Sequence, residues 1–268
     1  MRAYLHYFKL RIKTELQYRA AALAGIATQA FFGAMFIMFY AALYKSNGSV
    51  VTPMSMESLA SYLWLQQAFF ALTYTNTKEK EMIDMIKSGN LAYELIRPQN
   101  FYFKFFIKMF SYRLSAVTLR ALPILILGFL VPAPYGLTLP KNPFILIVFF
   151  IALILSGLLI NAMCELINIL TMFTLDDRGI RNLFYVVAET FTGNIVPLPF
   201  FPKWLMAISS VLPFRFISDF PYRTYTGDIL LSTGIKYLGL SLIWIIVFII
   251  IGFLISKIAL RKAVIQGG

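Results

Sequence analysis

Two acidic residues lie inside long apolar stretches, where ionisable side chains are rare. Glu165 interrupts the apolar run 142–173, and Glu189 follows Arg181 in the next apolar run. If the two runs form antiparallel helices, both carboxyl groups lie about 12–16 Å from the turn that joins them. Ionisable groups at such depth are costly and face a bundle interior or a wet cavity. These two acids are therefore the first candidates for chemistry.

Polar residues extend this site along one helix face. Asn161, Glu165 and Asn168 follow i, i+4, i+7 spacing, which places them in one stripe. Together with Glu189, the stripe could line a path for a substrate or respond to protons. It could also be a structural cluster that holds the fourth and fifth spans together. The residues leave both interpretations open.

Other reactive groups do not form a catalytic site. The single histidine, His6, lies on the polar face of a basic helix, and the single cysteine, Cys164, lies in an apolar run. No metal-ligand cluster and no set of paired catalytic carboxylates is found, so no enzyme activity and no metal site is predicted. The chain also lacks a G-x-x-x-x-G-K-[ST] phosphate loop, so any work with ATP must be done by another polypeptide.

Charged residues gather in the segment 78–98, between two apolar runs. Residues 78–90 show a helical pattern, in which the apolar face carries Met82, Ile83, Met85 and Ile86. The side chains here that could dock on a partner are Lys80, Glu81, Asp84, Lys87, Glu94 and Arg97. Charges of alternating sign suit docking on a protein of complementary charge. From the charges alone, a solvated loop fits as well.

The composition indicates an all-α integral membrane protein. Hydrophobic residues make up 59% of the 268 residues and charged residues 13%, and the mean hydropathy is +0.75. A span needs about 20 apolar residues. The expected transmembrane helices are 20–44, 58–77, 110–131, 142–173, 182–196 and 237–256. Residues 1–19 are basic and amphipathic, which predicts an interfacial helix rather than a removable signal peptide.

The distribution of lysine and arginine predicts the orientation. With the N-terminus inside, 18 of the 24 basic residues fall on the cytoplasmic side, and the C-terminus is cytoplasmic too. Arg120, near the start of the third span, is expected to reach the inner interface. The net charge of +12 is then an insertion signal, so no nucleic-acid partner is predicted.

The segment after the fifth span is rich in proline. "GNIVPLPFFPKWLMAISSVLPF" contains two apolar stretches that are too short to cross a membrane. Its apolar content favours a re-entrant helical hairpin over 197–214 on the outer side. The alternative is an ordinary outer loop whose aromatic residues enter the interface.

Three motifs carry a family resemblance: "SGNLAYELIRP" at 88–98, "GNIVPLPFFPKWL" at 193–205 with "LPF" at 212–214, and the terminal "QGG" at 266–268. In this order and topology, the chain resembles ABC-2 type permeases, the membrane subunits of bacterial ABC exporters. The likeness covers almost the whole chain. It implies that segment 78–98 holds a coupling helix, which docks on a separate ATPase subunit.

The resemblance also implies an assembly in the bacterial cytoplasmic membrane. Two permeases, identical or related, would form the path, and two ATPase subunits would bind ATP and Mg²⁺, so the permease itself needs no cofactor. The substrate could be amphipathic, lipid-like, a drug or a peptide, and export rather than import is implied by the resemblance alone. The alternative is a self-sufficient secondary transporter that uses Glu165 and Glu189.

Overall fold

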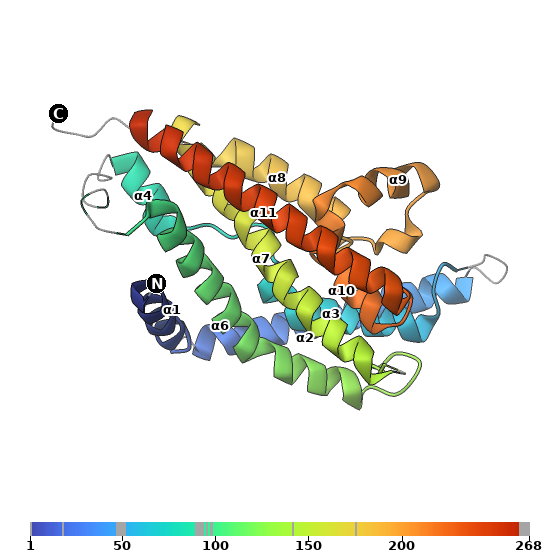
Figure 1. The fold of residues 1–268 in the computed structure, drawn as a ribbon. Helices are drawn as coiled ribbons and strands as arrows, with labels where there is room; N and C mark the ends of the chain where they lie inside the picture. Colours follow the sequence, from blue (N-terminus) through green and yellow to red (C-terminus); the bar gives the residue numbers. More distant parts are fainter. Residues whose placement is uncertain are drawn as a thin grey trace.

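The computed structural model describes residues 2–17, 19–46, 52–88, 94, 96, 99–140, 142–174 and 176–262. These residues form ten α-helices and two short 3-10 helices, and they contain no β-strand (Figure 1). The α-helices are α1 (Arg2–Glu15), α2 (Arg19–Ser46), α3 (Met56–Thr73), α4 (Lys80–Ser88), α6 (Phe101–Leu130), α7 (Pro143–Thr174), α8 (Arg178–Phe191), α9 (Lys203–Val211), α10 (Asp219–Tyr225) and α11 (Leu231–Lys262). The 3-10 helices are η1 (Leu198–Phe200) and η2 (Pro213–Phe216).

Four of the described helices are long and apolar enough to cross a membrane: α2, α6, α7 and α11. The expected second and fifth spans correspond to α3 and α8, which are not among these four. α8 has 14 residues, a length of about 21 Å. α3 has 18 residues and is buried along nearly its whole length, against α2, α6, α7 and α10. A helix enclosed in this way meets little lipid, which explains why it tolerates Gln66 and Gln67.

Two of the long helices extend beyond the segments expected from hydropathy. α6 begins at Phe101 rather than near 110, because Asn100 caps it: the Asn100 side chain accepts a hydrogen bond from the Phe103 amide at 3.3 Å. α11 spans Leu231–Lys262, whereas the hydropathy of the sequence predicted a helix over 237–256. The apolar run marks the part of each helix that meets lipid, and the helix itself continues past the interface.

α8 ends at Phe191, before the expected end of the fifth span at 196. The Thr192 amide still bonds to the Ala188 carbonyl at 2.8 Å, and Gly193 then takes a positive φ of 83°. Glycine adopts this left-handed conformation readily, which is why it so often follows the end of a helix. The Tyr62 hydroxyl donates to the Gly193 carbonyl at 3.2 Å and ties the turn to α3.

The proline-rich segment 197–214 contains η1, α9 and the start of η2. α9 lies at the surface, where Trp204 and Val211 are 66% and 74% exposed. The next helix, α10, was not predicted and is almost entirely buried against α7 and α3. The two short helices, α9 and α10, therefore extend beyond residue 214, where the hairpin was expected to end. Of the two, α10 packs inside the bundle.

The described helices divide the molecule into two ends. α1, α4 and the C-terminal end of α11 lie at one end, while α9 and the turn between α6 and α7 lie at the other (Figure 1). α1 packs on α6 through Phe8 and Phe110, whose ring centroids are 6.5 Å apart. The Tyr4 hydroxyl also accepts a hydrogen bond from the Asn100 amide at 2.9 Å.

Candidate functional site: a charged helix and its connection to the bundle

α4 is a short amphipathic helix whose apolar face is anchored in the bundle. Met82, Ile83 and Ile86 are buried. Met82 and Ile86 belong to a hydrophobic cluster with aromatic residues of α6, such as Phe105, and with residues of α7 and α11. The apolar face therefore fixes α4 against three long helices and leaves its charged residues exposed.

The four charged residues of α4 are exposed, but they are not equivalent. Glu81 forms ion pairs with Lys108 of α6 and, at 3.5 Å, with Arg11 of α1. Lys87 lies 3.3 Å from Asp177, in the turn between α7 and α8. Within the described part of the chain, Lys80 and Asp84 form no ion pair. Lys80 and Asp84 are therefore available to contact a partner protein.

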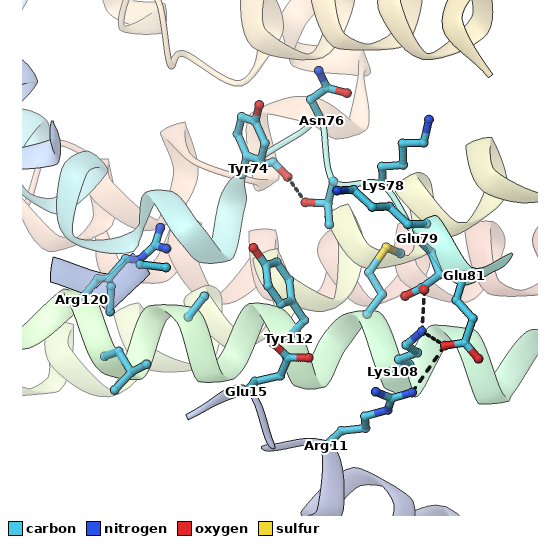
Figure 2. A pocket seen from close by; sticks show the side chains of 17 residues that line it. Arg11, Glu15, Tyr74, Asn76, Lys78, Glu79, Glu81, Lys108, Tyr112 and Arg120 are labelled. Atoms are coloured by element: carbon cyan, nitrogen blue, oxygen red, sulfur yellow. Dashed lines mark hydrogen bonds and ion pairs between the residues drawn. The ribbon is translucent and has the colours of Figure 1, made fainter. Parts of the chain in front are cut away.

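Lys108 is the centre of a charged network at this end of the molecule (Figure 2). Its Nζ atom lies 2.6 Å from a Glu79 carboxylate oxygen and also contacts Glu81. Partial burial raises the pKa of Glu81, but the hydrogen bond and charge of Lys108 outweigh this effect and hold the pKa below its usual value. Glu81 therefore stays ionised and links α1, α4 and α6.

The segment 74–79 joins α3 to α4, and side chains of α6 and α7 hold its start. Arg113, in α6, is fully buried and donates to the Leu72 carbonyl at 2.9 Å and to the Tyr74 carbonyl at 2.7 Å. Cys164, in α7, donates to the Thr75 carbonyl at 3.2 Å. A buried carbonyl without a donor costs about 1–3 kcal/mol, so these contacts determine where the segment lies.

Residues of α8 hold the rest of this segment. The Thr75 hydroxyl donates to the Glu189 carboxylate, and Arg181 donates to the Thr77 carbonyl at 2.9 Å. Lys78 lies 2.7 Å from Asp177, which also contacts Arg181 at 3.1 Å. The connection from α3 to α4 is thus bonded to α6, α7 and α8 within a few residues.

Asp177 is the anchor at the base of this connection. Burial raises the pKa of its carboxyl group, but hydrogen bonds from Lys78, Arg181 and Lys87, together with the charge of Lys78, hold the pKa well below its ordinary value. The carboxylate is therefore ionised throughout the physiological pH range. It binds the segment before α4 and the end of α4 to the turn between α7 and α8.

The polar stripe of α7 is enclosed between helices. Asn161, Glu165 and Asn168 are each 0% exposed. Asn161 donates to the Phe106 carbonyl of α6 at 3.0 Å, and Asn168 donates to Glu165 at 3.3 Å. Arg181 of α8 donates to the Asn168 side-chain oxygen at 2.7 Å. These contacts join α7 to α6 and α8, as a structural cluster would.

Glu189 does not meet Glu165 in this arrangement. It is 6% exposed, and its partners are Thr75 and, at 3.5 Å, Asn194. Glu165 bonds to Asn168 within α7, whereas Glu189 bonds to Thr75 just after α3, and no hydrogen bond joins the two carboxylates in the described residues. Among those residues, no three His, Cys, Asp or Glu side chains gather closely enough to hold a metal ion.

The two remaining candidates for docking have different positions. Glu94 is 7% exposed and forms a buried ion pair with Lys104 of α6. Its contacts are therefore internal. Arg97 lies outside the described residues, as do most of the 88–98 motif and the terminal "QGG".

Comparison with known proteins decides the family. The model of the "ABC-2 family transporter protein" family matches residues 30–267, which is most of the chain. The chain belongs to the ABC-2 transporter family. Searches of curated proteins and of solved structures find no match. The ABC-2 protein is thus a multi-pass membrane protein and a membrane permease of ABC-type transport.

Arg113 holds the permease's connecting segment most directly, and it is not among the site residues that the sequence predicts. Arg113 lies inside the expected third span, 110–131, where a charged side chain is itself a signal. The charge distribution predicts only that Arg113 lies on the cytoplasmic side of the membrane. Its two carbonyl partners, Leu72 at the end of α3 and Tyr74 just after it, could not be predicted, because they depend on where that helix ends.

Proposed function

We propose that the protein is the transmembrane subunit of an ATP-driven exporter in a bacterial cytoplasmic membrane. It would pair with a second permease, the same or related, to form the path for an amphipathic, lipid-like, drug or peptide substrate. Two copies of a separate ATPase would bind ATP and Mg²⁺. In this proposal the chain crosses the membrane six times, with α3 and α8 as the spans of lower hydropathy and both termini cytoplasmic.

One observation carries the proposal: α4 presents a charged face outward while its attachments reach α6, α7 and α8. A bound partner can shift a conformational equilibrium only through contacts that differ between the two states. If an ATPase moves α4, the bonded segment 74–79 moves with it and displaces the helices to which it is attached. The proposed docking residues are Lys80, Glu81, Asp84 and Lys87, with Arg97 as a further candidate.

The test is co-purification of the tagged full chain from membranes, with quantification of any protein that carries a G-x-x-x-x-G-K-[ST] motif. Asp84→Lys is the sharpest variant, because Asp84 is exposed and forms no ion pair in the described residues. We expect it to reduce recovery of the ATPase by roughly tenfold, since reversing one interface charge removes an attraction and adds a repulsion. Glu81→Lys should reduce recovery too, although it also breaks the contacts with Lys108 and Arg11.

The matched control is Glu57→Lys, an exposed acid at the first turn of α3 and at the opposite end of the molecule. It should leave recovery of the ATPase unchanged. If Asp84→Lys and wild type recover the ATPase equally, α4 is not the docking helix. If the chain purifies without any ATPase and transports under a proton gradient, it is a secondary transporter and the proposal is wrong.

A further inference from the structure

A cavity of about 770 Å³ lies between α1, the start of α2, the segment before α4, and α6 (Figure 2). This volume is typical of sites that bind small molecules. Five basic and three acidic side chains occur among the described residues that line it. At one end, the charges neutralise one another through the contacts of Lys108 with Glu79 and Glu81.

The other end of the cavity holds Arg120 and has no such balance. Arg120 lies about 18 Å beyond Lys108 along the axis of α6. It forms no ion pair within the described part of the chain, and its Nε atom is buried without a hydrogen-bond partner there. Arg120 is half-buried, and an unpaired charge inside a membrane-spanning helix is costly, which makes Arg120 a candidate functional residue.

α2 is shaped to receive the Arg120 guanidinium. A Cβ atom at Gly25 would lie 2.7 Å from Arg120 Cζ and 2.8 Å from Nε, so only glycine leaves room for the group in this position. Gly25 lies about 9 Å along α2 from Arg19, the first residue of that helix. The guanidinium is thus held against α2, toward the end of the bundle that carries α1 and α4.

The cavity wall near Arg120 is mostly apolar, although Glu15 of α1 also lines the cavity (Figure 2). Ala21 and Ala22 of α2 and Ala116 and Leu119 of α6 line this part of the cavity. The neighbouring residue Leu23, on the membrane-spanning helix α2, is 68% exposed, so an apolar surface adjoins the cavity at this level. A ligand that suits the site has a negative group for the guanidinium and an apolar part for the wall. Arginine is well adapted to the negative group, because its planar fork pairs with phosphate or carboxylate.

We propose that this cavity binds an anionic amphiphile, with its negatively charged headgroup on Arg120 and its apolar chain along the alanine and leucine wall. The headgroup could belong to a membrane lipid or to a transported molecule, since both present the same chemistry. The proposal does not depend on the ATPase partnership, and its test requires neither ATP nor transport.

The experiment is native mass spectrometry of the full chain in a nonionic detergent, titrated with palmitoyl-oleoyl phosphatidylglycerol and, in parallel, with palmitoyl-oleoyl phosphatidylcholine. We expect wild type to bind the anionic lipid at least about tenfold more tightly, as charge-assisted hydrogen bonds to a phosphate predict. Arg120→Gln should reduce the ratio of the two affinities to near one. Arg178→Gln, which removes an exposed arginine outside the cavity, should leave the ratio unchanged.

A second variant guards against misfolding of Arg120→Gln. Gly25→Ala keeps every charge and improves helix propensity, but it displaces the flexible guanidinium, so it should weaken the preference for the anionic lipid several-fold. Glycerol 3-phosphate, which carries a phosphate without an acyl chain, should not displace the lipid at equal concentration. Equal binding of both lipids by wild type, an unchanged ratio in Arg120→Gln or in Gly25→Ala, or displacement by glycerol 3-phosphate would overturn the proposal.

Discussion

Arg113 shows how a single buried cation can organise a junction between helices. Its guanidinium satisfies carbonyl oxygens of Leu72 and Tyr74 at the end of α3. The negative end of a helix favours a cation in this position. The residue therefore holds in place the point where α3 stops and the connection to α4 begins.

Replacing Arg113 with methionine leaves a shorter, unbranched apolar side chain and removes all of its donors. We expect Arg113→Met to destabilise the protein by about 2 kcal/mol, because the buried Leu72 carbonyl loses its side-chain donor. The Tyr74 carbonyl loses the Arg113 bond as well and keeps only the one from the Thr77 hydroxyl, at 3.3 Å. Thermal melting of the purified chain in detergent measures this, with Arg178→Met as an exposed control. An unchanged or higher melting temperature would show that the cost of burying the charge exceeds the benefit of the contacts.

Glu165 distinguishes the two interpretations of the buried polar stripe. Its side chain is 0% exposed and accepts a hydrogen bond from the Asn168 side-chain amide in the same helix. Glu165→Gln should keep ATP hydrolysis by the assembled complex within about twofold of wild type, because the amide retains an oxygen that accepts the Asn168 bond. A loss of activity greater than about tenfold, with unchanged assembly, would instead assign the carboxylate to the transport path.

The spacing in the sequence predicted which polar residues share a face, but not which partners they meet. Asn161, Glu165 and Asn168 lie in one buried stripe. Their similar depth grouped Glu165 and Glu189 into one candidate site, yet Glu165 bonds to Asn168 of its own helix and Glu189 bonds to Thr75 after α3. Depth follows from the rise of a helix, whereas rotation about the helix axis depends on packing, which the sequence of one helix does not specify.

Among the elements, the turn after α8 depends on one glycine. Gly193 has a φ of 83°, and a Cβ atom there would lie 2.6 Å from the Tyr62 hydroxyl. Gly193→Ala should therefore cost about 1–3 kcal/mol in stability, from backbone strain and from this contact. Gly179→Ala, where a Cβ atom meets nothing within 4 Å, should be neutral or slightly stabilising in the same melting assay. Equal melting temperatures for the two variants would contradict this account.

The attachment of α4 has a predictable dependence on pH. The pKa of Asp177 is lower in the folded protein, so its stabilising contribution is complete above the ordinary pKa of aspartate, about 3.9. This contribution is lost only as the pH falls through the lower folded value. Amide hydrogen exchange in α4, corrected for intrinsic rates, should therefore be the same at pH 7 and pH 5.

Asp177→Asn at pH 7 should have the same effect as protonating Asp177 in strong acid, because both remove the negative charge. Without the carboxylate, Lys78, Lys87 and Arg181 lose their common partner, and exchange of the α4 amides should become faster. The amides of α11 serve as the internal control and should not change. If α4 exchanges at the wild-type rate in this variant, the turn between α7 and α8 does not hold it.

The elements show where hydropathy is informative. α7, at Pro143–Thr174, lies within one residue of the expected 142–173, because both of its ends coincide with the ends of the apolar run. α6 and α11 are longer than their apolar runs, and α10 lies in a segment where an outer connection was expected. α10 is buried by α3 and α7, and hydropathy does not record which neighbours enclose a short helix.

At the scale of the whole molecule, the two ends of the bundle should face opposite sides of the membrane. Lys80 of α4 and Lys203 of α9 are exposed at these two ends. Cys164, the single native cysteine, is 1% exposed and should not react with an impermeant maleimide. Lys80→Cys should react only from the cytoplasmic side and Lys203→Cys only from the outside. Labelling of both from one side would contradict the topology.

The brevity of segment 74–79 limits how the molecule can change shape. Six residues reach about 20 Å when fully extended, and here several of their backbone carbonyls are already bonded to other helices. The segment therefore cannot absorb a displacement of α4 by extending or refolding on its own. A push of a few ångströms at the membrane surface must either rupture these bonds or tilt the neighbouring helices together, so intermediate conformations should be short-lived.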